Sequence, residues 1–309
     1  MPKAVALAGG VGAAKFLQGL VRVVPPEDST VVGNVGDNIW LFGVYVAPDL
    51  DIVTYALGGV WDREQGWGIK GDSYRVRDAL TRLGSEGAKW FGLGDRDFAT
   101  CAFRTESLRL GQSLSEITDR IRRSFGVATR IFPATNEELT SMVKLAGGWV
   151  SFEEYYVRLR SEPVVEEISY RGAENASLVP GIREALQESE TIFVCPSNPV
   201  ASIAPILAVA EMRELLAAYR EKCICISPLV GGKSIKGPAD KMMMSLGYGS
   251  SVVDLARFYQ DICSTLVIDT TDAASIEDVE KLGLHCVALD TIMTDEAKSA
   301  KLVSAVLNA

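Results

Sequence analysis

Short apolar runs, each followed by a polar or glycine-bearing loop, recur near both ends of the chain. Amphipathic stretches with helical spacing lie between several of them, as at 13–23. Buried strands that alternate with helices are typical of an α/β protein with a parallel sheet. We therefore predict a Rossmann-like parallel sheet with helices on both faces, whose strands include residues 5–8, 29–32, 191–194, 223–226, 265–268 and 286–289.

The alternation is interrupted in the middle of the chain. Most of the tryptophans lie there among turn residues, and S-x-x-E at 113–116 and T-x-x-E at 135–138 have the spacing of helix capping boxes. A βαβ core needs no such stretch. We predict a nucleotide-binding core made of 1–60 and 185–309, and an inserted, smaller and mainly helical subdomain at 61–184 that covers the active site.

Composition narrows the class of protein. The chain has 309 residues, 48% of them hydrophobic, and a net charge of -9, which argues against a surface that coats nucleic acid. Its apolar runs are too short to cross a bilayer, so we expect no membrane partner. The six cysteines form no C-x-x-C pair, which predicts buried free thiols and a cytoplasmic protein. A single histidine disfavours a Ser–His–Asp mechanism.

The glycine turn after the first strand is the first candidate site. Gly10 and Gly12 lie between an apolar strand and a helix, with Lys15 three residues later. Such a turn lets a phosphate approach the helix N-terminus and its unpaired N–H groups. Lys15 stands where a dinucleotide fingerprint needs Gly or Ala, and the turn is not a Walker A loop. The plainer interpretation is an ordinary strand–helix turn; we favour a phosphate site.

Further polar loops follow the later predicted strands. Because the carboxyl ends of parallel strands meet at one sheet edge, we expect these loops to lie near the glycine turn. The lysines of 231–241 would meet phosphate as point charges, although lysines are also common in solvated loops. The predicted phosphate-binding residues are therefore Gly10, Gly12, Lys15, Asn34, Ser197, Asn198, Gly232, Lys233, Lys236 and Lys241.

Two aspartates open the next predicted helix. Asp49 is placed to cap this helix and Asp51 lies in its first turn. Both carboxylates follow closely behind two glycine loops, so the alternative is that they bind Mg²⁺ or accept a proton.

The ordered set of motifs resembles one family over nearly the whole length. The motifs are GGVGAAK at 9–15, NVGD at 34–37, PDLD at 48–51, WGI at 67–69, LGDRD at 93–97, SNP at 197–199 and the 231–241 loop. Together they are similar to the 2-phospho-L-lactate transferase (CofD/FbiA) family of coenzyme F-420 biosynthesis.

This resemblance implies an activity. Such enzymes move a phospho-three-carbon-acid group, 2-phospholactyl or phosphoenolpyruvyl, from a guanosine diphosphate-linked donor to the ribityl hydroxyl of the deazaflavin Fo. GMP is released, Mg²⁺ is required, and members tend to be homodimers. The nature of the acid is left open by the sequence.

The resemblance also assigns residues. The catalytic candidates come instead from carboxylate chemistry near the glycine loops: they are Asp51, Asp49 and Asp37, with Asp37 and Asp49 as metal ligands, and which of them acts as base stays open. Asp51 and Gly92 match positions that contact the deazaflavin, and Trp67 and Arg96 are further candidates for that contact. Some relatives carry a polar or basic side chain at the position of Gly92, and Gly92 offers only backbone.

Two other functions compete with the transferase. One is a non-enzymatic nucleotide-sugar-binding regulator, as in the related gluconeogenesis-factor family, which shares the fold and the glycine loop. The other is an NAD-dependent dehydrogenase, which Lys15 and the absence of an acidic residue directly after the second strand disfavour.

Overall fold

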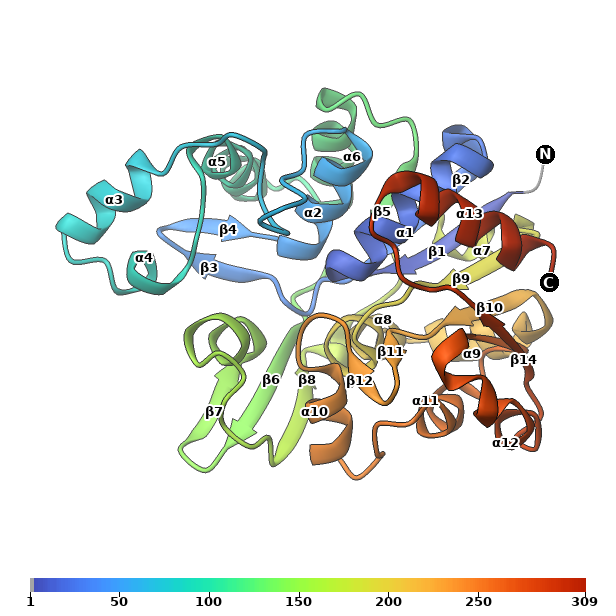
Figure 1. Cartoon of the computed structure of the whole chain (residues 1–309). Helices are drawn as coiled ribbons and strands as arrows, with labels where there is room; N and C mark the ends of the chain where they lie inside the picture. Colours follow the sequence, from blue (N-terminus) through green and yellow to red (C-terminus); the bar gives the residue numbers. More distant parts are fainter. Residues whose placement is uncertain (1–2) are drawn as a thin grey trace.

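A seven-stranded parallel sheet forms the centre of the computed structural model, which describes residues 3–309 (Figure 1). Its strands lie in the order β14-β13-β10-β9-β1-β2-β5, and every neighbouring pair is parallel. They are β1 (Ala4–Ala8), β2 (Ser29–Gly33), β5 (Arg130–Pro133), β9 (Thr191–Val194), β10 (Cys223–Ile226), β13 (Thr265–Asp269) and β14 (His285–Leu289). The predicted Rossmann-like parallel sheet is confirmed.

The position of β1 explains where a ligand binds. It pairs with β2 on one side and with β9 on the other, so the connections leave it in opposite directions. A crevice opens at such a switch point, at the carboxyl ends of the strands. All five residues of β1 are buried, as a strand covered on both faces requires.

Helices cover both faces of the sheet. Helix α1 packs against α13, where Gly19 meets the backbone of Ser299 so closely that a Cβ would collide with it. Asp295 caps α13 through the Lys298 N–H. The helices of the core are α1 (Gly10–Val23), α2 (Pro48–Leu57), α7 (Ile182–Glu188), α8 (Ala204–Leu207), α9 (Met212–Ala218), α10 (Ala239–Ser245), α11 (Val252–Tyr259), α12 (Ile276–Glu280) and α13 (Glu296–Leu307).

The middle of the chain contains strands as well as helices. Its helices are α3 (Arg75–Arg82), α4 (Glu86–Trp90), α5 (Asp95–Arg109) and α6 (Leu114–Ser124). A separate antiparallel sheet follows, formed by β6 (Thr140–Leu145), β7 (Gly148–Ser151) and β8 (Glu167–Arg171). Because β5 belongs to the central sheet, the expectation that 61–184 is mainly helical is only partly right. The division into a core and one inserted subdomain stays a prediction.

One predicted capping box forms and the other does not. Ser113 and Glu116 make the reciprocal bonds at the start of α6. No helix begins at Thr135, which lies between β5 and β6 and whose hydroxyl bonds the carboxylate of Glu137. The capping interpretation at 135–138 is therefore wrong, because the hydroxyl closes a local turn instead.

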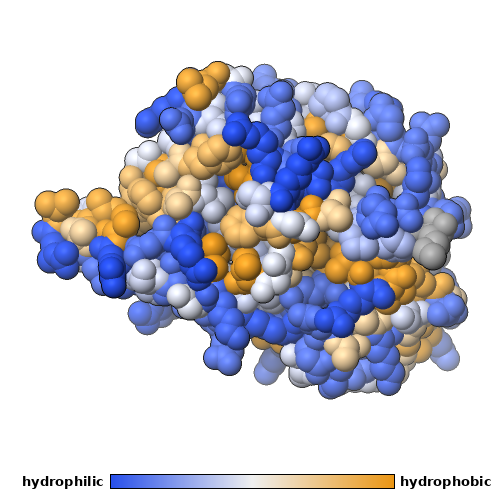
Figure 2. Space-filling view, turned by 90° about the horizontal axis from the view of Figure 1, so that it is seen from above, coloured by the Kyte–Doolittle hydropathy of each residue, from blue (hydrophilic) through white to orange (hydrophobic). Residues whose placement is uncertain are grey.

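Apart from α2, the elements from 39 to 110 project from the sheet. Hairpin β3 (Ile39–Leu41) and β4 (Val44–Val46) lies beside α5, and α3 and α4 form the far end (Figure 1). Figure 2 shows apolar side chains gathered on this projecting end, where Leu83 is 84% exposed. Among the described residues, no helix combines the length and apolar character needed to span a bilayer. All six cysteines are free and buried, as predicted.

Candidate functional site

The glycine turn brings the N-terminus of α1 against the loop after β9. Gly10 has φ +71°, which glycine adopts without strain, and α1 begins there. A Cβ at Gly12 would collide with the Pro196 carbonyl oxygen, so this glycine serves close packing of two loops. The first turn of α1 holds no acidic side chain and leaves N–H groups without helical acceptors, which favours an anion.

Asp49 does not cap its own helix. Ala47 is the N-cap residue of α2, and the Asp49 carboxylate reaches across to the glycine turn. Its oxygens accept hydrogen bonds from the Gly10 N–H at 2.7 Å and from Asn34 Nδ2 at 2.8 Å. The capping interpretation of Asp49 is wrong, because these tertiary donors replace the local ones. Asn34 also donates to the Ala201 carbonyl and accepts from Gly36, so its amide is used within the protein.

Three buried carboxyl groups share one region, and none of them forms an ion pair with a Lys or Arg among residues 3–309. Burial, with Asp49 and Glu153 nearby, raises the pKa of Asp37 well above its usual value. Burial raises the pKa of Asp49 to about 6, and burial with the Asp49 charge raises the pKa of Glu153 to about 8. Asp37 Oδ1 is buried with no hydrogen-bond partner among residues 3–309. An orphaned acceptor beside other carboxylates fits a hard divalent cation such as Mg²⁺.

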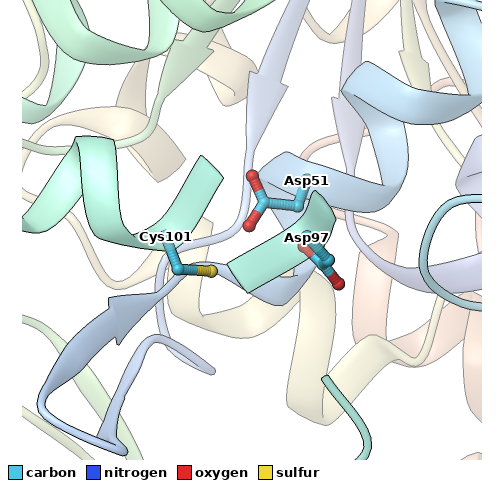
Figure 3. Close-up of side chains that lie close together, drawn as sticks. All are labelled: Asp51, Asp97 and Cys101. Atoms are coloured by element: carbon cyan, nitrogen blue, oxygen red, sulfur yellow. The ribbon is translucent and has the colours of Figure 1, made fainter. Parts of the chain in front are cut away.

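A second acidic group lies between α2 and α5. Asp51, Asp97 and Cys101 each offer a ligand atom within 4.8 Å of the others (Figure 3). The guanidinium of Arg104, only 1% exposed, forms an ion pair with Asp51. Burial, with Asp51 nearby, raises the pKa of the Cys101 thiol well above its usual value, so the thiol stays protonated. Since Arg104 already supplies a cation, this group does not need a metal ion.

Basic side chains gather near the N-terminus of α1. Burial, followed by the charges of Arg63 and Lys236, lowers the pKa of Lys15, which places three cations close together. Arg63 donates to Gln18 Oε1 at 2.7 Å. The Lys236 ammonium rests on the backbone of Gly66, where a Cβ would collide with it. Cations held together in this way need an anion, and a diphosphate supplies one.

A cavity of about 690 Å³ is lined by some of these groups, whereas Gly12, Lys15, Asn34, Asp37 and Arg63 are not among its lining residues. Its lining includes Gly10, Val11, Asp49 and Lys236 together with Asp51, Asp97 and a set of aromatic rings. Glu153 lines it as well. The aromatic residues that line it are Tyr55, Trp67, Trp90, Phe91 and Tyr156.

Gly92 lines the cavity and touches Trp67. A Cβ at Gly92 would collide with the Trp67 ring, so the glycine is what allows this ring to take its place in the wall. Trp67 is 38% exposed and packs edge-on against Tyr74, with ring centroids 6.1 Å apart. An apolar ring wall with a few polar groups is the usual lining of a small-molecule site.

Other predicted residues lie outside the cavity wall. Gly231 and Gly232 have positive φ and form the turn between β11 (Leu229–Val230) and β12 (Lys233–Ser234), which leaves Lys233 exposed. Lys241 is exposed on α10. The Arg96 guanidinium donates a hydrogen bond to the Lys70 carbonyl, and Arg96 does not line the cavity.

Two more of the predicted phosphate-binding residues, Ser197 and Asn198, lie in the loop after β9. Asn198 Oδ1 accepts from the backbone N–H groups of Val200 and Ala201 and so caps the following turn. The Ser197 hydroxyl is buried without a partner among the described residues, and the Ser197 backbone nitrogen lies near Gly12. Of the pair, Ser197 therefore has the free hydrogen-bonding capacity.

Several residues of the site were not singled out from the sequence. They are Tyr55, Arg63, Asp97, Arg104 and Glu153. Asp97 belongs to the quoted LGDRD stretch, which was a usable signal. Arg104 and Glu153 lie in segments whose patterns give no sign that the charged side chain turns inward.

The comparisons with known proteins agree on one family. The model of the family described as 2-phospho-L-lactate transferase CofD matches residues 4–307. The chain is 40% identical to a phosphoenolpyruvate transferase of Streptomyces griseus, covering 96% of this chain and 95% of that protein. It is 36% identical to a 2-phospho-L-lactate transferase of Methanosarcina mazei, covering 97% and 98%.

A solved structure shares the fold. A protein member of the UPF0052 family from Bacillus halodurans superposes with a TM-score of 0.64, covers 98% of both chains and is 13% identical. The match to the family model over almost the whole length, with relatives at this level of identity, shows that the chain belongs to the 2-phospho-L-lactate transferase CofD family.

Proposed function

We propose that the protein transfers a phospho-three-carbon-acid group from a guanosine diphosphate-linked donor to the ribityl hydroxyl of the deazaflavin Fo and releases GMP. The observation that carries the proposal is one cavity lined both by the start of α1 with Lys236 and by aromatic and acidic side chains. A diphosphate suits the first of these groups and a flat ring with a polyol suits the second.

The residues divide the work between the two substrates. The first turn of α1, with Lys15, Arg63 and Lys236, holds the diphosphate and stabilises charge that develops on it. Trp67 and Trp90 flank the deazaflavin ring, and Asp51 bonds its polar substituents. Phosphoryl transfer needs mainly such positioning and charge stabilisation, with little covalent work from the protein.

We propose Mg²⁺ as the cofactor, held by Asp37 and Asp49. Their carboxylates lack a cation among the described residues, and Asp37 has an unpartnered oxygen. Two carboxylates suffice for Mg²⁺, because this ion usually keeps several waters and substrate phosphate oxygens as further ligands. When bound, the ion neutralises charge on the phosphates.

The test is incubation of the purified protein with Fo, Mg²⁺ and the donor, with GMP and the phosphodiester product quantified by liquid chromatography and mass spectrometry. We expect both products in equal amounts. Nucleotide binding without GMP release would instead favour a regulator. Competition among the lactyl, enolpyruvyl and glyceryl donors in the same assay identifies the acid.

We also propose that the protein is a homodimer. The apolar surface over α3 and α4, with Leu83 largely exposed, is a candidate contact between copies. Light scattering should give about twice the chain mass of 33.3 kDa, and a monomer mass would contradict this proposal.

A further inference from the structure

Asp97 presents one free carboxylate oxygen to the cavity. It lies in the first turn of α5, is 7% exposed, and its Oδ1 accepts the Tyr55 hydroxyl at 2.8 Å. Its backbone N–H bonds Asp72 Oδ2 at 3.1 Å, which fixes the start of the helix. Oδ2 receives no hydrogen bond from the described residues, and Asp97 lines the cavity wall. Because buried acceptors normally receive a hydrogen bond, the unpartnered Oδ2 of this carboxylate can accept one from a ligand.

Asp51 has a cationic partner that its neighbour Asp97 lacks. Its carboxylate is ion-paired with Arg104, and both side chains are almost fully buried. A guanidinium in contact stabilises the ionised carboxylate and so lowers its basicity. Asp97 has only the neutral Tyr55 hydroxyl in hydrogen-bond contact. Two close carboxyl groups in unlike surroundings divide acid–base roles between them.

The segment that contacts Lys236 also comes close to Asp97. Gly66 contacts Lys236, and a Cβ at Gly68 would be 3.9 Å from Asp97 Oδ2. Two residues of chain span at most about 7 Å. The short segment 66–68 therefore contacts both Lys236 and Asp97, and all of these residues line the same cavity.

We propose that Asp97 Oδ2 accepts the proton of the attacking hydroxyl and that Tyr55 positions Asp97. The inference rests on the proposed function. The hydroxyl oxygen forms a bond to the phosphorus that carries the three-carbon acid, and its proton moves to Asp97. The bond from that phosphorus to the oxygen bridging to GMP breaks, and its electron pair leaves on GMP. Asp97 later releases the proton to water.

The surroundings of Asp97 support this role. Burial and the Asp51 charge raise the pKa of Asp97 to about 7, against the Tyr55 hydrogen bond and the Arg104 charge, which lower it. The groups that face it are Asp51 and Tyr55 from α2, Cys101 and Arg104 from α5, and Asp72 from the loop before α3. General bases work best with a pKa near the operating pH.

The decisive variant is Asp97→Asn, assayed for GMP release with Fo and donor. We expect kcat to fall by about 10²–10⁴-fold while the KM for Fo changes little, because the amide still bonds substrate but takes no proton. Asp95→Asn is the matched control: Asp95 is in the same helical turn, bonds Ser73 and Val76, and does not line the cavity. It should keep kcat within about twofold.

The variant Tyr55→Phe tests the role of Asp97 through the pH dependence of kcat, which would not change if Asp97 were only structural. Loss of the hydroxyl removes a hydrogen bond to the ionised carboxylate, so the acid limb of the kcat–pH profile should shift upward by about one pH unit. Asp97→Asn with kcat near that of the wild type, or an unmoved acid limb in Tyr55→Phe, would overturn the assignment. A wild-type protein that releases no GMP would instead overturn the proposed function, and this inference with it.

Discussion

Because the ion pair between Asp51 and Arg104 is buried, we can predict how much its loss lowers the free energy of unfolding. Arg104 is 1% and Asp51 is 4% exposed. Arg104→Met keeps much of the side-chain volume but leaves a buried carboxylate without its cation. Breaking a buried pair from one side costs about 3–5 kcal/mol. We expect the free energy of unfolding to fall by that amount near pH 8.

The loss should depend on pH in a defined direction. Burial already raises the pKa of Asp51 in the folded protein, against the opposing charge of Arg104. Removing Arg104 raises this pKa further above the unfolded value, so the folded variant holds a proton that the unfolded chain releases. The stability of the variant therefore falls as pH rises above about 4, by up to about 1.4 kcal/mol per pH unit, and this fall continues to a higher pH than in the wild type.

Urea denaturation followed by tryptophan fluorescence, near pH 5.5 and near pH 8, measures the effect. Adding Asp51→Asn to Arg104→Met should recover at least about 2 kcal/mol near pH 8, because the unpaired charge is then gone. An equal loss at both pH values would refute this account of the pair. A double variant no more stable than Arg104→Met would refute it as well.

Three further predictions concern ligands. Gly92→Ala should displace the Trp67 ring and raise the KM for Fo about tenfold, and an unchanged KM would remove that ring from the Fo site. Lys236→Ala should raise the donor KM about tenfold while Lys241→Ala, outside the cavity wall, should not; equal effects would contradict the placement of the diphosphate. Mg²⁺ at about 100 times its dissociation constant should stabilise the wild type by about 2.7 kcal/mol in thermal unfolding and Asp37→Asn much less, and equal stabilisation would move the ion elsewhere.

The sequence predicts the core strands well because each is an apolar run with a clear end. Strands β9 and β10 have the expected bounds, and β1, β2, β13 and β14 differ by one residue. Strand β5 was missed, because its sequence RIFP is short, begins with an exposed arginine and lies inside the stretch taken as an insertion. Strand β5 pairs with β2, about a hundred residues earlier, and the local sequence pattern does not indicate such a long-range pairing.

The same limit applies to the site. Local chemistry places Asp49 at a helix start, but only the folded chain turns it toward Gly10 and Asn34. Arg104 and Glu153 look like ordinary surface charges in the sequence, and tertiary packing buries them. The motif around 93–97 predicts a functional loop. Only the folded chain shows that the Tyr55 hydroxyl bonds Oδ1 of Asp97 and that Oδ2 receives no hydrogen bond from the described residues.

The central claim is that one cavity holds the diphosphate at the N-terminus of α1 and the acceptor beside Asp97. A crystal structure of the protein with GDP, Mg²⁺ and Fo tests it most directly. We predict the diphosphate between Gly10 and Lys236, the ion on Asp37 and Asp49, and the ribityl chain within hydrogen-bond distance of Asp97. A diphosphate bound outside this cavity, or a deazaflavin remote from Trp67, would contradict the claim.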